Sequence, residues 1–136
     1  MIELIPIVNE SPYYHVIFNY MVGDGDGETT YDFTCDDSEI EEVVKYAKIL
    51  NKLKPLEGYW GICFKDVPEE YPGEYIGISK EEYNIFLGLL HSREDIGIKG
   101  EFWDCLRDDI GYNFLVFQYI EIYYYDKNNV KFEVKF

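Results

Sequence analysis

Three acidic residues at alternate positions, Asp24, Asp26 and Glu28, stand among the glycines of the stretch GDGDGE. Convergent carboxylate oxygens suit calcium, and the first three ligands of an EF-hand loop have this spacing. The later positions do not continue such a loop, because Thr29 occupies its sixth position and Cys35 its twelfth. The stretch therefore favours an acidic hairpin tip, with divalent-metal binding as the alternative.

Nucleophilic catalysis would need a cysteine beside a histidine. Here Cys63 or Cys105 would have to meet His15 or His91. No local pattern marks such a pair, and free cysteines most often act as small core hydrophobes. The odd number of cysteines, without a C-x-x-C spacing, indicates neither a disulfide framework nor a zinc site. We therefore expect a protein with reduced thiols that is not an enzyme.

Phosphate binding by the glycine-rich stretch is also disfavoured. Phosphate loops offer backbone amides at a helix N-terminus, with a lysine nearby, whereas carboxylates fill this stretch and a strand pattern follows it. The aromatic content of 18% would suit stacking on bases, so a small-ligand module that binds a nucleotide or a divalent metal is the alternative function. A Walker loop, a G-x-S-x-G elbow and an H-E-x-x-H helix are all missing from the sequence. No cofactor is expected.

Charge is the most informative property of the sequence. It has 27 acidic and 12 basic residues, for a formal net charge of −15. The first lysine is Lys45, and nine acidic side chains lie just ahead of it: Asp24, Asp26, Glu28, Asp32, Asp36, Asp37, Glu39, Glu41 and Glu42. Nucleic acids and anionic membranes attract lysine and arginine, so neither is expected as a direct partner. A basic protein surface is the expected partner.

The nine acidic residues are the predicted partner-binding site. On a strand, side chains two residues apart lie about 6.6 Å apart, close to two base steps of one DNA strand at about 3.4 Å each. A rigid array at that spacing could replace phosphates in a basic groove and give fast, salt-dependent association. The alternative is that the acidity only keeps the chain soluble. A second acidic set could extend this surface, although Arg107 would interrupt it; the set comprises Glu69, Glu70, Glu74, Asp104, Asp108 and Asp109.

The hydrophobic pattern predicts the elements that would position these residues. Residues 14–22 and 30–35 alternate as two strands, and the glycines between them permit a tight reversal, which predicts a β-hairpin. Ser38 and Glu41 have the spacing of a capping box at the start of an amphipathic helix. Pro55 ends that helix.

The middle of the chain continues with a strand and two further helices. Residues 57–66 are predicted to form a strand. The spacing of Ser79 and Glu82 predicts a capping box for a second helix that runs to about His91. Residues 100–111 predict a third, shorter helix.

The C-terminus returns to strands, at residues 114–126 and 130–136. In the last strand, every second side chain is apolar and is expected to face the core: Val130, Phe132, Val134 and Phe136. The intervening lysines and glutamate are expected to face water. This strand could form an open edge that pairs with a second chain to give a homodimer, although its alternating charges disfavour indiscriminate addition.

Together these elements predict a single α+β domain over residues 1–136. The expected architecture is an antiparallel β-sheet of about five strands with two or three helices packed on one face. The sequence shows neither a basic targeting segment at its start nor a run near the ~20 apolar residues of a membrane span. A soluble, cytoplasmic protein is expected.

The small acidic α+β chain, with GDGDG on a hairpin and the aromatic stretch LKPLEGYWGICF behind it, resembles phage-encoded inhibitors of host defence. These include anti-CRISPR proteins and DNA mimics. The chain is also similar to acidic immunity proteins that block nuclease toxins. The resemblance implies stoichiometric inhibition of a defence or nucleic-acid-handling protein at its basic nucleic-acid-binding surface. It implies neither catalysis nor a cofactor, and it places a phage-encoded inhibitor in the host cell cytoplasm.

Overall fold

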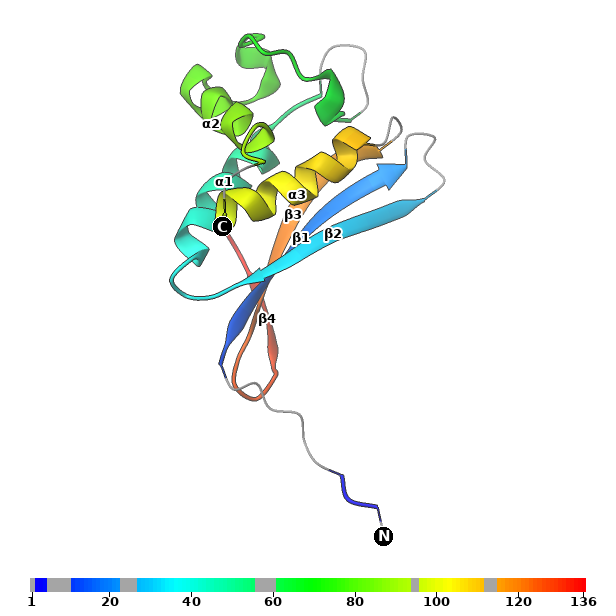
Figure 1. Ribbon diagram of the computed structural model, residues 1–136, viewed down its shortest axis with the longest axis vertical. Helices are drawn as coiled ribbons and strands as arrows, with labels where there is room; N and C mark the ends of the chain where they lie inside the picture. Colours follow the sequence, from blue (N-terminus) through cyan, green and yellow to red (C-terminus); the bar gives the residue numbers. More distant parts are fainter. Residues whose placement is uncertain (1, 5–10, 23–26, 56–60, 94–95, 112–114) are drawn as a thin grey trace.

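The computed structural model describes residues 2–4, 11–22, 27–55, 61–93, 96–111 and 115–136. Within these ranges, three α-helices cover one face of a four-stranded antiparallel sheet (Figure 1). The predicted α+β class is confirmed, with four strands rather than about five.

The four strands are β1 (Tyr13–Val22), β2 (Glu28–Cys35), β3 (Leu115–Tyr125) and β4 (Lys131–Val134). Their order in the sheet is β2-β1-β3-β4, and each pair of neighbours is antiparallel. β1 and β3 are therefore central, whereas β2 and β4 form the two edges of the sheet.

The three helices are α1 (Ile40–Lys52), α2 (Lys80–Leu90) and α3 (Ile98–Gly111). Two 3-10 turns, η1 (Phe64–Asp66) and η2 (Glu74–Ile76), lie in the long connection between α1 and α2. α1 packs on β3, α3 packs on β2 and β3, and α2 packs on both other helices. α3 thus lies along the sheet beside its β2 edge (Figure 1).

Aromatic side chains fill the core between the sheet and α3. The ring of Phe102, from α3, lies 5.3 Å from that of Phe18 and 5.6 Å from that of Phe33. Edge-to-face pairs of this kind add about 0.5–1.5 kcal/mol each beyond their buried area. The hydroxyl of Tyr20 donates a hydrogen bond to the carbonyl of Cys105 at 2.9 Å. Much of the aromatic content is therefore used in packing α3 onto the sheet.

The β1–β2 hairpin is confirmed. The backbone N–H of Val22 donates to the carbonyl of Gly27 at 2.9 Å, and Met21 lies opposite Glu28 in the register. The predicted tip residues 23–26, including Asp24 and Asp26, lie outside the described residues.

The first helix forms as predicted, but its predicted capping box is wrong. The Asp36 carboxylate accepts from the Ser38 backbone N–H at 2.9 Å and from its hydroxyl at 2.6 Å. The Glu39 side chain in turn accepts from the Asp36 N–H at 3.2 Å. The Glu39 N–H donates to the backbone carbonyl of Asp36 at 3.1 Å, so a turn of residues 37–39, rather than a side-chain capping box, precedes the helix. The second capping box, formed by Ser79 and Glu82, is confirmed.

The strand predicted at residues 57–66 is wrong in its described part. Ile62 makes one isolated bridge to Phe117, and the 3-10 turn η1 follows directly. The N–H of Phe64 donates to the buried carboxylate of Asp109 at 2.7 Å rather than to a neighbouring strand. A side chain distant in the sequence thus replaces the strand partner of this segment.

The inward face predicted for the last strand is also wrong. Val130, Phe132 and Phe136 are 47%, 50% and 40% exposed, and only Val134 packs against the core. The reason is the extent of the helical layer, since the sheet projects beyond the helices at the β4 end (Figure 1). The alternating pattern correctly predicted a strand, but the described helices leave most of its apolar face uncovered.

Candidate functional site

Helix α3 sorts its side chains into three directions. The buried stripe consists of Ile98, Phe102, Cys105, Leu106 and Asp109. A second stripe lines a surface hollow with the end of α2 and contains Trp103, Arg107 and Ile110. The third stripe is exposed and acidic, and contains Glu101, Asp104 and Asp108. The acidic side chains share one face because they are three and four residues apart.

The carboxylates of this third stripe interact with one another and with the start of α1. Burial, followed by the charges of Asp104 and Glu39, raises the pKa of Glu101 above its ordinary value. Burial and the charge of Asp104 likewise raise the pKa of Asp108. Like charges therefore form one continuous run from the N-terminus of α1 along α3. We call Glu39, Glu101, Asp104 and Asp108 the acidic ridge.

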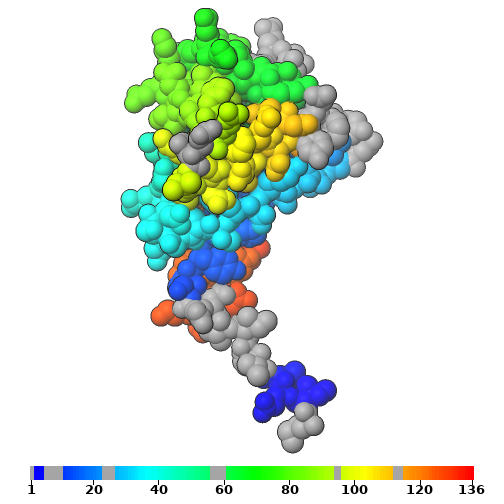
Figure 2. Space-filling view, in the orientation of Figure 1, coloured from blue at the N-terminus to red at the C-terminus, as the bar shows by residue number. Residues whose placement is uncertain are grey.

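The acidic ridge borders the β2 edge of the sheet. Figure 2 shows α3 (yellow) and β2 (cyan) side by side on one face, in agreement with their contacts. Burial, then the charges of Glu39 and Asp36, raise the pKa of Cys35 at the end of β2 to about 12. Asp36 thus adds its charge to the field where β2, α1 and α3 meet.

One basic side chain lies beside the ridge, because Lys99 lines a surface hollow together with Glu39 and Glu42. The ion pairs of His15 with Asp32 at 2.6 Å, and of Lys52 with Glu82 at 3.2 Å, do not involve the carboxylates of the ridge. Arg107 lies between Asp104 and Asp108 in the sequence but lines the hollow on the α2 side of the helix. Arg107 thus borders the acidic stripe on its α2 side, three residues from Asp104.

The structure divides the predicted partner-binding residues among several places. Glu28 and Asp32 are exposed on the outer face of β2, which the helices leave open. The connection from β2 to α1 carries Asp36, Asp37 and Glu39. Glu41 and Glu42 stand in the first turn of α1, whereas Asp24 and Asp26 lie outside the described residues.

Several of these carboxylates have local structural contacts. Hydrogen bonds from Ser38 lower the pKa of Asp36 below its ordinary value. The Glu42 side chain accepts from the Tyr46 hydroxyl at 2.9 Å. Glu41 lines a hollow that also contains Lys45 and Lys48. Of the nine predicted residues, Glu39 is the one that joins the acidic ridge.

The second acidic set is also divided. Asp104 and Asp108 belong to the ridge, but Asp109 is only 1% exposed and cannot contribute to a surface. The exposed residues Glu69, Glu70 and Glu74 lie on the connection between η1 and α2. Sequence reasoning missed Glu101, although its spacing to Asp104 and Asp108 could have placed all three on one helical face.

The thiols are unsuited to nucleophilic attack. Burial and the charge of Asp109 raise the pKa of Cys63, and burial and the charge of Asp108 raise that of Cys105. A reactive cysteine needs the opposite shift, toward the thiolate. Of the predicted bases, His15 is engaged by Asp32.

The described residues form one small enclosed cavity and several larger, open surface hollows, of which the one lined by Trp103 and Arg107 measures about 550 Å³. A mostly apolar cavity beside Cys63, Tyr83 and Phe86 has a volume of about 20 Å³, which is near the size of one water molecule. Among the residues that the structure describes, no group of three His, Cys, Asp or Glu side chains could hold a metal ion. Asp24 and Asp26 of the predicted alternative metal site lie outside that part of the chain.

Helices α1, α2 and α3, as described, are too short or too polar to cross a membrane. In comparisons with known proteins, no family model matches the sequence, and neither a curated protein nor a solved structure matches the chain. The acidic ridge is therefore interpreted from its own geometry and charge.

Proposed function

We propose that this chain is an acidic binding protein that inhibits a nucleic-acid-binding protein by occupying its basic surface. The observation that supports the proposal is the acidic ridge, in which half-buried Glu39 and exposed Glu101, Asp104 and Asp108 stand in one run beside the β2 edge. The proposal involves neither catalysis nor a cofactor. A defence complex of a host cell is the intended class of target, as for the phage-encoded inhibitors that the composition resembles.

The spacing of the ridge suits this role. Side chains three or four residues apart on a helix lie about 5–6 Å from each other. That distance falls between one and two base steps of a nucleic acid strand, at about 3.4 Å each. Because α3 packs on the sheet through its buried stripe, the carboxylates are held on a rigid element. A rigid array loses little conformational entropy when it binds.

The electrostatics of the ridge favour a cationic partner. Mutual repulsion contributes to the raised pKa values of Glu101 and Asp108, so a lysine or arginine placed beside them would relieve that repulsion. The net charge of −15 would attract a basic surface over a longer range and speed association at low salt.

A capture experiment tests this proposal. The immobilised protein is exposed to the heparin-binding fraction of a cell lysate, which is enriched in proteins with basic nucleic-acid-binding surfaces. The ridge variant carries Glu101→Gln, Asp104→Asn and Asp108→Asn, and the matched control carries Glu69→Gln, Glu70→Gln and Glu74→Gln. Each removes three charges from exposed positions.

We expect the wild type and the control to retain the same protein from this fraction at physiological salt, and the ridge variant to lose it. Equal retention by the ridge variant would contradict the proposal. A small-ligand module, the alternative function, would instead show a thermal shift with calcium, magnesium or a nucleotide, since a ligand at 100 times its Kd stabilises by about 2.7 kcal/mol.

A further inference from the structure

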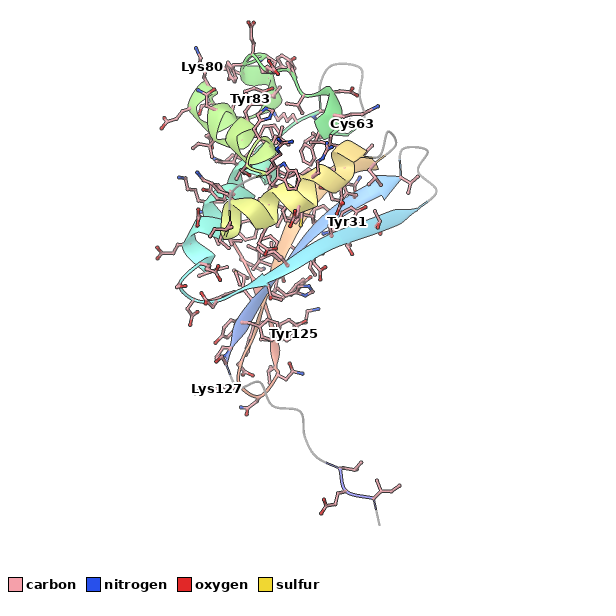
Figure 3. All side chains as sticks on the ribbon, in the orientation of Figure 1. Tyr31, Cys63, Lys80, Tyr83, Tyr125 and Lys127 are labelled. Carbon is pink, nitrogen blue, oxygen red and sulfur yellow. The ribbon has the colours of Figure 1, made fainter. Side chains whose placement is uncertain are left out.

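The β3–β4 hairpin forms an arm at the β4 edge of the sheet, whereas the acidic ridge borders the opposite, β2 edge. Figure 3 labels Tyr125 and Lys127 on this arm, far from Lys80 and Tyr83 in the helical layer. β4 is paired on one side only, with β3, so its outer side is an edge of the sheet. Unpaired backbone groups along such an edge can bind another strand.

A row of aromatic rings lies on the same face of the sheet as the helices and runs from β1 to the β4 edge. The ring of Tyr124 lies 4.9 Å from that of Tyr14 and 6.2 Å from that of Phe132. Phe132 ends the row at the sheet edge, where it is 50% exposed. An aromatic row that stops at an open edge would gain contacts if another strand continued it.

The opposite face of β4 carries alternating charges. Lys131 lies on this face, with its Nζ 4.1 Å from the centre of the Tyr123 ring. Because side chains two residues apart share a face, Glu133 and Lys135 accompany it. Lys127 adds a further positive charge at the hairpin turn. Lys127, Lys131 and Lys135 are balanced by Glu121, Asp126 and Glu133, so the arm is neutral in a chain whose net charge is −15.

The charge pattern selects among the ways in which two copies of β4 could pair. A two-fold axis perpendicular to the sheet makes the two strands antiparallel and keeps equivalent faces on the same side. Two residues that face each other must therefore both have even numbers or both have odd numbers. An axis at Lys131 or at Glu133 would place that residue opposite its own copy, and like charges directly opposite are destabilising.

An axis at Phe132 gives opposite charges in both symmetric pairs. Lys131 then faces Glu133 of the second copy, and Glu133 faces Lys131 of the second copy. On the other face, Phe132 meets its own equivalent, and Val130 meets Val134. An axis at Val134 would also pair opposite charges, but half of its paired residues lie beyond the end of β4.

We infer that β4 is a self-association edge, at which two copies of this chain pair antiparallel about Phe132. The two sheets then form one continuous sheet, and the rings of Tyr14, Tyr124 and Phe132 continue into their equivalents across the axis. Two short paired strands bury less surface than the roughly 1,200–2,000 Å² of a typical stable complex, so the dimer dissociates on dilution. The acidic ridges of both copies stay outside the interface.

Charge reversal at the two facing positions tests the inferred register. Lys131→Glu places two glutamates opposite each other in both pairs, and Glu133→Lys does the same with two lysines. We expect either variant alone to be monomeric at concentrations where the wild type is dimeric. We expect an equimolar mixture of the two variants to form a heterodimer, and the double variant Lys131→Glu/Glu133→Lys to recover the homodimer.

Sedimentation velocity over a wide range of protein concentration provides the measurement, and native mass spectrometry identifies the heterodimer by mass. Lys80→Glu, an exposed position in α2, is the matched control and should leave the dimer unchanged. Circular dichroism verifies that each variant is folded. A monomeric wild type at all concentrations, or single variants that dimerise like the wild type, would overturn the inference. Failure of the two variants to form a heterodimer would overturn it as well.

Discussion

Asp109 is the most unusual single residue in the chain. One carboxylate oxygen accepts the N–H of Phe64 at 2.7 Å, and the other has no hydrogen-bond partner among the described residues. Burial raises the pKa of this carboxyl from 3.8 to about 7. The residue joins α3 to the η1 turn, at the cost of placing an ionisable group in the core.

The raised pKa of Asp109 makes a prediction about stability and pH. Since the folded state binds this proton more tightly than the unfolded state, the stabilisation is fully present below pH 3.8 and is lost as the pH rises through about 7. A tenfold difference in proton affinity between the two states corresponds to about 1.4 kcal/mol. Asp109→Asn keeps a carbonyl acceptor for Phe64. We expect its free energy of unfolding, measured relative to that of the wild type, to be higher at pH 8 than at pH 4.

Urea denaturation at several pH values measures the difference between the two proteins, in which the titration of their shared carboxylates cancels. Glu70→Gln, at an exposed position, serves as the control and should show no such pH-dependent difference. A constant free-energy difference between Asp109→Asn and the wild type from pH 4 to pH 8 would show that Asp109 is ionised throughout.

The sequence predicts which side of a helix a residue lies on, because helical spacing decides it. It does not predict which distant residue a side chain contacts. Asp108 and Asp109 are adjacent in the sequence, yet one is exposed and the other buried. The 100° turn per helical residue separates neighbours in this way. That Asp109 would meet the N–H of Phe64 depends on how α3 packs against η1, which local spacing does not reveal.

At the scale of elements, the starts of helices α1 and α2 can be compared directly. α2 begins with the predicted reciprocal bonds of Ser79 and Glu82, both at 3.1 Å. α1 begins after a turn in which Asp36, not Ser38, accepts the backbone N–H. A serine with the same sequence spacing therefore has different roles in the two helices.

This difference predicts unequal effects of alanine substitutions. Ser79→Ala removes the N-cap of α2, and we expect it to lower the free energy of unfolding by about 1 kcal/mol. Asp36→Ala removes the acceptor of a turn N–H, and we expect a loss of about 0.5–1.5 kcal/mol. Ser38→Ala removes only an exposed hydroxyl donor, so its effect should be clearly smaller. Chemical denaturation of the three variants measures these differences. If Ser38→Ala lowered the free energy of unfolding as much as Asp36→Ala, the role of Asp36 as the acceptor in this turn would be contradicted.

The periodicity of the sequence was sufficient to predict the β1–β2 hairpin, α1, α2, α3 and the C-terminal pair of strands. It was insufficient at residues 57–66, where Asp109 binds the segment that was expected to be a strand. It was also insufficient for β4, because a period of two specifies an apolar face but not the layer that covers it. Both errors arise from tertiary packing.

At the scale of the whole molecule, charge is distributed unevenly. The acidic ridge lies where α1, α3 and β2 meet, and the neutral β3–β4 arm lies at the opposite edge of the sheet (Figure 1). The sequence placed Glu39 in one predicted acidic set and Asp104 and Asp108 in a second, but it did not predict that these residues would meet. Three of the four ridge residues come from the second half of the chain, and the packing of α3 beside β2 brings them to Glu39.

The central claim is that the acidic ridge takes the place of nucleic acid on its partner. A competition assay tests it most directly: fluorescence anisotropy of a labelled oligonucleotide bound to the captured protein is followed during titration with this chain. We predict full displacement by the wild type and by the Glu69→Gln/Glu70→Gln/Glu74→Gln control. Displacement by the Glu101→Gln/Asp104→Asn/Asp108→Asn variant should need about tenfold more protein, since three lost charge pairs at about 0.5 kcal/mol each sum to about 1.5 kcal/mol. Equal displacement by the ridge variant, or binding that leaves the oligonucleotide in place, would contradict the claim.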